Sequence, residues 1–261
     1  MDLLDLARAA ADAGAGFVRQ AARPAGPGAW SVKGHHDFVT EVDRGAEEVI
    51  RRILLAGEPG SAILGEELSP GDAVGPGLVW VVDPLDGTTN FLHGLPWYAV
   101  SVAAAVDGRL EAGVVVNVPA GRRAEARRGG GAWEDGHRLA VSTIDDPAFA
   151  LIGTGFPFKT TETLGEYARQ FAQVAAGTSG IRRPGAAALD LVDVAAARYD
   201  GFWEQWLGPW DMAAGTLIIR EAGGRVTDSE GRDREIGPGP VLAGNPAMHA
   251  WLLECVRPAA E

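Results

Sequence analysis

Twelve residues from Trp80 to Phe91, WVVDPLDGTTNF, place two carboxylates, a glycine and two threonines directly after an apolar run. Leu78 to Val82 is predicted to be a buried strand that ends with Asp83. Pro84 has no amide and a fixed φ, so we expect the strand to stop there and the chain to turn. Amides and hydroxyls after such a turn suit an anion, and two hard carboxylates suit a cation that holds a phosphate. A plain Asp-Gly turn with a capping threonine is the alternative.

Other acids stand at predicted ends of strands and helices. Asp43 lies three residues after Thr40, which is the spacing of a capping box at the start of a helix. Glu66 follows a short apolar strand, Glu204 lies among large aromatic residues, and Asp211 lies near a helix start. Each also has a structural explanation, as a helix cap or a solvated carboxylate, so none identifies a site alone.

Composition limits the classes of protein. The chain has 261 residues, of which 46% are hydrophobic, so a sizeable core is expected. A formal net charge of −12 argues against a general nucleic-acid or anionic-membrane binder. Cys255 is the only cysteine, which excludes an internal disulfide and a cysteine-based metal cluster. The acidic first residues and the lack of ~18 uninterrupted apolar residues lead us to expect a cytoplasmic protein.

Strands that alternate with helices predict layered α/β packing. We expect hairpin turns at Asp107-Gly108 and Asp135-Gly136. The pattern changes near Asp145, so we expect an N-terminal α+β half over residues 1–145 with most candidate metal ligands. A C-terminal α/β half over residues 146–261 would complete the substrate site within one compact unit. The elements predicted beside the central strand are helices over residues 3–22, 42–54, 160–176, 186–197 and 211–222, a final helix, and strands over residues 62–64, 98–106, 110–118, 149–153, 200–206 and 241–243.

The motifs together resemble the inositol monophosphatase family, because they occur in its order and at its approximate spacings. The resembling segments are DFVTEVD (37–43), GEE (65–67), WVVDPLDGTTNF (80–91), GAAALD (185–190), Glu204 and WDMAAG (210–215). The resemblance implies a layered α-β-α-β-α sandwich of the inositol monophosphatase and fructose-1,6-bisphosphatase type. It also implies a Mg²⁺-dependent, lithium-sensitive phosphatase that usually forms homodimers and hydrolyses small phosphate monoesters, with inositol 1-phosphate the expected substrate.

Site roles carry over from that resemblance residue by residue. Glu66, Asp83 and the backbone carbonyl of Leu85 match the ligands of a first Mg²⁺, and Asp83, Asp86 and Asp211 match those of a second. A third, weaker ion would use Glu66 and waters. Gly87 and Thr88 match the phosphate cradle, while Asp86, Gly185, Ala186, Ala187, Glu204 and Asp211 match the positions that hold the substrate hydroxyls. Asp43 and Thr88 match the pair that orients or deprotonates the attacking water, with Glu66 as a competing base. Two departures are Ala186, where many members have a hydroxyl residue, and Lys33, which stands one residue closer to DFVT than the lysine of the animal enzymes.

Electrostatics favours the same assembly. Two carboxylates ~4 Å apart repel by ~1 kcal/mol in water and by ~4 kcal/mol at an effective dielectric of about 20. Convergent acids therefore stay partly protonated or bind divalent ions, and oxygen-only ligands favour Mg²⁺ over Zn²⁺. The hypothesis that follows is in-line attack by a metal-activated water without a phospho-enzyme.

Alternatives remain open. Fructose 1,6-bisphosphate, histidinol phosphate or a nucleotide 3′-phosphate are rival substrates within the same superfamily. A regulatory, RNA-associated binding protein on the same fold is a different class, to which only the doublets Arg122-Arg123, Arg127-Arg128 and Arg182-Arg183 point. Arginine pairs in an acidic chain are more often solvated or at a dimer interface. Gly129 to Gly131 does not form a dinucleotide-binding fingerprint.

Overall fold

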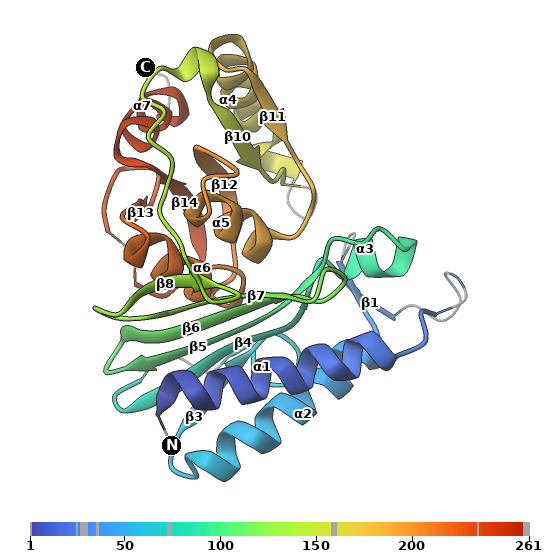
Figure 1. Cartoon of the computed structure of the whole chain (residues 1–261). Coiled ribbons are helices and arrows are strands. Elements are labelled where there is room, and N and C mark those ends of the chain that lie inside the picture. Colours follow the sequence, from blue (N-terminus) through green and yellow to red (C-terminus); the bar gives the residue numbers. More distant parts are fainter. Residues whose placement is uncertain are drawn as a thin grey trace.

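The computed structural model describes residues 2–24, 26, 31–34, 37–71, 75–157, 161–233 and 235–257. Helices and sheets alternate in five layers (Figure 1). The expected α-β-α-β-α sandwich is therefore confirmed. Among the described residues, no helix is both long and apolar enough to cross a bilayer.

The first layer is formed by α1 (Leu3–Gln20) and α2 (Glu41–Gly57). Asp2 caps α1 by accepting from the Leu4 amide (2.9 Å). The small residues of α1 let α2 approach closely, since a Cβ on Gly14 would lie 2.7 Å from the Ile50 side chain. A short hairpin of β1 (Ser31–Gly34) and β2 (Asp37–Val39) precedes α2. Lys33 lies on β1, whose side chains fall outside the described part of the structure.

The second layer is a sheet in the order β3-β4-β5-β6-β7-β8-β9. Only β3 and β4 pair in parallel, and the remaining neighbours are antiparallel. Both expected hairpin turns are present, because Asp107, Gly108, Asp135 and Gly136 all have positive φ. The strands are β3 (Ala62–Gly65), β4 (Leu78–Asp86), β5 (Ala99–Val106), β6 (Arg109–Asn117), β7 (Arg122–Arg127), β8 (Gly131–Glu134) and β9 (His137–Arg138).

One sequence prediction about β4 is wrong. The strand does not stop at Asp83 but continues to Asp86. Asp83 pairs with Ser101 and Asp86 with Ala99, so two residues of β4 face one residue of β5. This bulge accommodates Pro84, whose missing amide would otherwise interrupt the ladder. The turn follows at Gly87 and leads into the short helix α3 (Thr88–His93).

The third layer contains α5 (Ala187–Ala195) and α6 (Pro209–Glu221), packed between the two sheets. Every residue of α5 is buried, as expected for a helix covered on both sides. A Cβ on Gly113 of β6 would lie 3.0 Å from the backbone of Ala214, so small residues let α6 lie against the sheet. α6 begins two residues before the predicted start at Asp211, because Pro209 occupies its first turn.

The fourth layer is a sheet in the order β11-β10-β12-β14-β13, parallel across its first three strands and antiparallel across the rest. Its outer face packs on α4 and α7 through side chains such as Trp203 and Leu252. Thr160, the predicted start of α4, lies outside the described residues. The elements are β10 (Leu151–Thr154), β11 (Gly180–Arg182), β12 (Gly201–Leu207), β13 (Arg225–Thr227), β14 (Gly239–Gly244), α4 (Leu164–Gly177) and α7 (Pro246–Val256).

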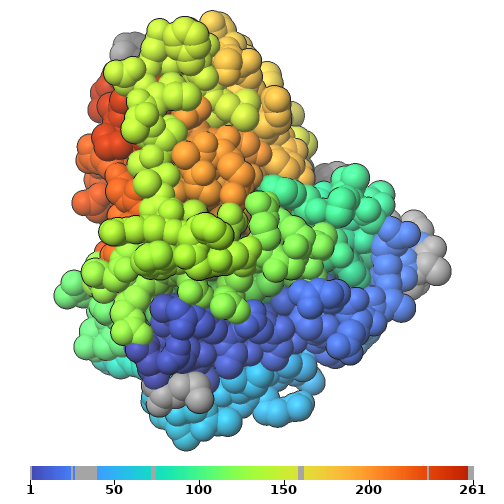
Figure 2. All heavy atoms as spheres, viewed as in Figure 1, coloured from blue at the N-terminus to red at the C-terminus, as the bar shows by residue number. Residues whose placement is uncertain are grey.

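A connecting segment, residues 139–146, runs from the seven-stranded sheet (the lower sheet in Figure 1) toward the five-stranded sheet (the upper sheet). It crosses the face shown in Figure 2, where it is yellow-green. The amide of Val141 donates to the carbonyl of Ala222 at the end of α6 (3.0 Å). The Asn245 side chain donates to Ser142 Oγ (2.8 Å) and to the carbonyl of Ile144 (2.9 Å). The segment is thereby bonded to the end of α6 in the middle layer and to Asn245, which caps α7.

Candidate active site

The bulge at the end of β4 brings two acids into the interior. Asp83 is 1% exposed and Asp86 is 8% exposed. Asp83 Oδ1 accepts from the Leu85 amide (2.9 Å), while its Oδ2 is buried without a hydrogen-bond partner among the described residues. A buried, unpaired carboxylate oxygen is unfavourable unless a ligand or cation approaches it.

The turn after these acids requires glycine. Gly87 has φ 90°, a conformation that L side chains rarely adopt. A Cβ there would lie 3.0 Å from the carbonyl oxygen of Trp97 and 3.2 Å from Cβ of Ala186. Gly87 therefore allows the β4 turn to lie directly against the loop before α5.

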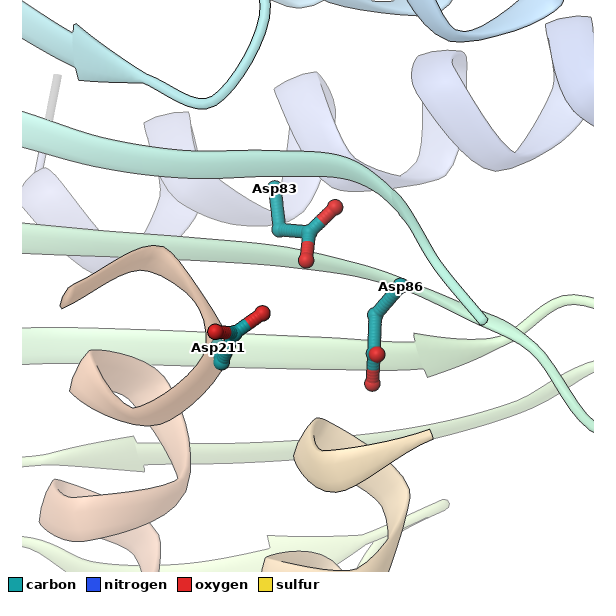
Figure 3. A group of neighbouring side chains, drawn as sticks. All are labelled: Asp83, Asp86 and Asp211. Atoms are coloured by element: carbon teal, nitrogen blue, oxygen red, sulfur yellow. The ribbon is translucent and has the colours of Figure 1, made fainter. Parts of the chain in front are cut away.

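Asp211 joins the two acids from the third layer. Its Oδ2 accepts from the Gly208 amide (2.6 Å), so it caps the start of α6 as the structural explanation predicts. The same carboxylate also lies beside Asp83 and Asp86, with ligand atoms of all three within 4.8 Å of one another. Figure 3 shows the three side chains turned toward a common space between β4 and α6.

The negative charges of the acids in this space repel one another. Burial and the nearby charges of Glu66 and Asp86 raise the pKa of Asp83 well above its usual range. Burial and the charge of Asp211 raise the pKa of Asp86 to about 8, although amide hydrogen bonds oppose the shift. Glu66 lies close enough to act on Asp83 but is not part of the three-acid cluster. Crowded oxygen donors with an unpaired buried oxygen fit a hard divalent cation.

Asp43 and Thr88 form a second contact behind the cluster. Thr88 Oγ1 donates to Asp43 Oδ1 (2.8 Å) and lies 3.0 Å from the carbonyl oxygen of Leu85. The other carboxyl oxygen of Asp43 accepts from the Thr40 amide (2.9 Å), which completes the predicted capping box. Burial raises the pKa of Asp43, while hydrogen bonds from Thr40 and Thr88 oppose the rise. Asp43 therefore caps α2 and orients Thr88 at the same time.

A cavity of about 700 Å³ opens over these groups. Its far wall includes Gly185, Ala186 and Ala187 at the start of α5, and Glu204 of β12. Asp86 Oδ2 accepts from the Ala188 amide (2.7 Å), which fixes the first turn of α5 against the acids. Of the residues predicted for the site, Asp43 alone does not line this cavity, since it lies behind Thr88; those that do are Glu66, Asp83, Leu85, Asp86, Gly87, Thr88, Gly185, Ala186, Ala187, Glu204 and Asp211.

Among the further residues that line the cavity are two charged ones that were not predicted as site residues. Asp190 is buried in α5, and its Oδ1 has no hydrogen-bond partner among the described residues. It falls within the GAAALD segment, but the motif alone does not show which way its side chain points. Arg183 belongs to a doublet interpreted as solvated or interfacial, and the structure shows the residue exposed while it also lines the cavity. Its guanidinium lies 4.3 Å above the ring of Phe156 and its charge lowers the pKa of Asp86.

Fold and site together define a layered sandwich with an acidic centre between its two sheets. Residues 2–261 match the inositol monophosphatase family. The chain is 47% identical to the Nus factor SuhB of Pseudomonas aeruginosa, over 85% of this chain and 83% of that protein. It is 44% identical to an inositol-1-monophosphatase of Rhizobium meliloti, over 87% of this chain and 85% of that protein.

A solved structure agrees with these relatives. The extragenic suppressor protein suhB from Bartonella henselae superimposes with a TM-score of 0.88 at 39% identity, over 99% of each chain. The chain belongs to the inositol monophosphatase family.

Proposed function

We propose that this protein hydrolyses a small phosphate monoester in a Mg²⁺-dependent reaction, and that inositol 1-phosphate is its substrate. The observation that carries the proposal is the cluster of Asp83, Asp86 and Asp211, with a buried, unpaired oxygen on Asp83. The likeness to an inositol-1-monophosphatase supports the choice of substrate.

The residues that would hold the ions are those expected from the family pattern. Glu66, Asp83 and the Leu85 carbonyl would hold one Mg²⁺, Asp83, Asp86 and Asp211 a second, and Glu66 with waters a third. Bound Mg²⁺ would neutralise the acids, polarise the phosphoryl group and lower the pKa of a coordinated water. Lithium sensitivity is part of the same proposal.

The chain's own groups would perform the remaining tasks. Thr88 Oγ1 donates its proton to Asp43, so its lone pairs are free to orient an attacking water. Asp43, with its raised pKa, would take up the proton from that water through Thr88, and Glu66 is the competing base. The backbone at Gly87 and Thr88 would bind the phosphoryl oxygens.

The alcohol part of the substrate would lie toward the far wall. Glu204 lines the cavity there, and its charge raises the pKa of Asp190, which locates its carboxylate near the wall formed by α5. Glu204, Asp86 and Asp211 would accept from substrate hydroxyls, and the backbone of Gly185 to Ala187 would complete the contact. Removing Glu204 should therefore raise KM more than it weakens Mg²⁺ binding.

The test is phosphate release from inositol 1-phosphate with and without Mg²⁺, beside fructose 1,6-bisphosphate, histidinol phosphate and a nucleotide 3′-phosphate. We expect Mg²⁺-dependent release from inositol 1-phosphate that lithium suppresses. Faster turnover of another ester would change the substrate and keep the site, whereas no turnover of any ester would refute the hydrolase. Solvent ¹⁸O should enter phosphate with inversion at phosphorus, and net retention would refute in-line attack.

An RNA-associated role is the second candidate, because several relatives are called Nus factors. The arginines in and directly after β7 offer little support, since Arg123 pairs with Asp12 (2.6 Å) and Arg128 with Glu235 (2.9 Å). Salt-dependent retention of RNA at physiological ionic strength would favour it. A homodimer is also proposed from the family pattern, and light scattering in solution tests it.

A further inference from the structure

One face of α2 contacts two of the three segments that carry candidate metal ligands, the turn after β3 and the turn after β4. Asp43, Glu47 and Arg51 are spaced four residues apart, which places them in a row along the helix. Asp43 binds Thr88 beside the β4 turn (2.8 Å). Arg51 donates to Ser69 Oγ in the turn after β3 (2.8 Å). Glu47 lies between them and has not been assigned a role so far.

Glu47 is 0% exposed, although it carries a carboxyl group. Its Oε2 accepts from the Glu67 amide (2.8 Å), and the Leu68 amide lies 3.3 Å from both of its oxygens. These are the two amides that directly follow Glu66. A hydrogen bond to a buried carboxylate is stronger than one between neutral groups, so the turn is held firmly.

Gly65 makes this approach sterically feasible. A Cβ at this position would lie 2.1 Å from Oε1 of Glu47. The glycine is therefore needed for the space that the carboxylate occupies rather than for a positive φ. On the other side of Glu66, its own amide donates to the carbonyl of Val82 on β4 (3.2 Å). The backbone around Glu66 is thus fixed from α2 and from β4.

We propose that Glu47 is a positioning residue that sets the place of Glu66 for a divalent cation, an inference that rests on the proposed function. Glu66 lines the cavity, whereas Glu47 is not among the described residues that do so. Glu47 therefore acts through the turn and not by touching the ligand. Groups of this kind behind a metal ligand typically change metal affinity when they are altered.

The main test is Mg²⁺ binding by calorimetry to Glu47→Gln. The variant keeps the shape but replaces one accepting oxygen with an NH₂ group that opposes the amides of Glu67 and Leu68. We expect the Mg²⁺ dissociation constant to rise about 10- to 100-fold. Glu48→Gln is the matched control, because Glu48 is the exposed neighbour on the same helix, and its Mg²⁺ binding should stay at the wild-type value. Equal binding by Glu47→Gln and Glu48→Gln would overturn the inference.

Two further measurements separate positioning from general stability. Gly65→Ala should displace the carboxylate of Glu47 without removing it and weaken Mg²⁺ binding in the same direction. In metal-free protein, the amides of Glu67 and Leu68 should exchange slowly, and at least ~10-fold faster in Glu47→Gln. A lower melting temperature with unchanged exchange at these two amides would overturn the inference.

Coupling to Glu66 gives the decisive control. In a Glu66→Gln background, Glu47→Gln should have little additional effect on Mg²⁺ affinity, since the residue it positions is already altered. Full additivity of the two changes would contradict action through Glu66. Absence of Mg²⁺ binding by the wild type would overturn the proposed function and this inference together, whereas equal binding by wild type and variants overturns the inference alone.

Discussion

Replacing Asp86 with asparagine should stabilise the metal-free protein while removing most of its activity. The pKa of Asp86 is raised from 3.8 to about 8, because burial and the charge of Asp211 disfavour its ionised form. At pH 7 the unfolded chain has lost this proton and the folded chain retains it, so the group destabilises the fold by about 4 kcal/mol at ~1.36 kcal/mol per pKa unit.

Asparagine removes the titrating proton at a smaller loss elsewhere. Its oxygen still accepts from the Ala188 amide, which lies 2.7 Å from Asp86 Oδ2, while its NH₂ group replaces the hydroxyl of the protonated acid, and this changed hydrogen bonding costs about 1 kcal/mol. The net gain is about 3 kcal/mol, which for a chain of this length corresponds to roughly 6–12 °C in Tm.

The raised pKa of Asp86 also predicts how the difference in Tm between wild type and variant changes with pH. An acid whose folded pKa is raised does not destabilise the fold below its unfolded value near 3.8, and its penalty grows as the pH rises toward 8. Tm measured by scanning calorimetry in EDTA should therefore be nearly equal for wild type and Asp86→Asn near pH 4 and differ most near pH 8. Asp145→Asn is the control, because Asp145 is exposed and far from the cluster in sequence. A lower metal-free Tm of Asp86→Asn at pH 8 would refute the account of crowded charges.

Three other variants probe buried groups. Asp190→Asn should raise the metal-free Tm, because burial and the charge of Asp86 raise the pKa of Asp190 well above its usual range, and a fall in Tm would contradict this. Burial and the charge of Arg225 lower the pKa of His249 to about 4, so the fold should lose about 3 kcal/mol as the pH falls from 6.5 to 4, and urea midpoints of His249→Gln should show a weaker loss. Arg198→Met should destabilise by about 2–3 kcal/mol, since it removes the ion pair of the buried Asp193 and leaves Glu134 with the longer pair to Arg122 (3.9 Å), while calorimetry should show unchanged Mg²⁺ affinity.

Short-range patterns predicted the elements whose cause is local. The hairpin at Asp107-Gly108 follows from two residues that tolerate positive φ, observed at 51° and 79°. The first helix follows from the face formed by Leu6, Ala7 and Ala10, all of which are buried. The predicted central strand ended too early, at Asp83, because Pro84 cannot take part in a regular ladder of hydrogen bonds. The pairing with β5 shows that a bulge lets the strand continue to Asp86.

The candidate site could be predicted because its acids occur in an order and spacing typical of the family. The contacts that side chains make across layers could not be predicted. Arg183 is exposed, as expected for a solvated arginine, but the sequence does not show that it lies over Phe156 in the lining of the cavity. Glu47 is the same residue type as its exposed neighbour Glu48 on the same helix, and the turn after β3 explains why Glu47 is buried. Such residues are defined by what folds against them, which sequence spacing does not encode. The division into halves at residue 145 stays a prediction.

The acids of the cluster come from separate layers, so their repulsion weakens the contact between those layers. Asp83 and Asp86 lie on the lower sheet, whereas Asp211 lies on a helix that packs between the sheets. Repulsion among them therefore acts across the contact between two layers, and any cation that neutralises them would strengthen that contact. Without a cation, hydrogen bonds from the Gly208 amide to Asp211 and from the Ala188 amide to Asp86 hold the acids in place. The arrangement that suits the site to a divalent cation therefore also lowers the stability of the cation-free protein.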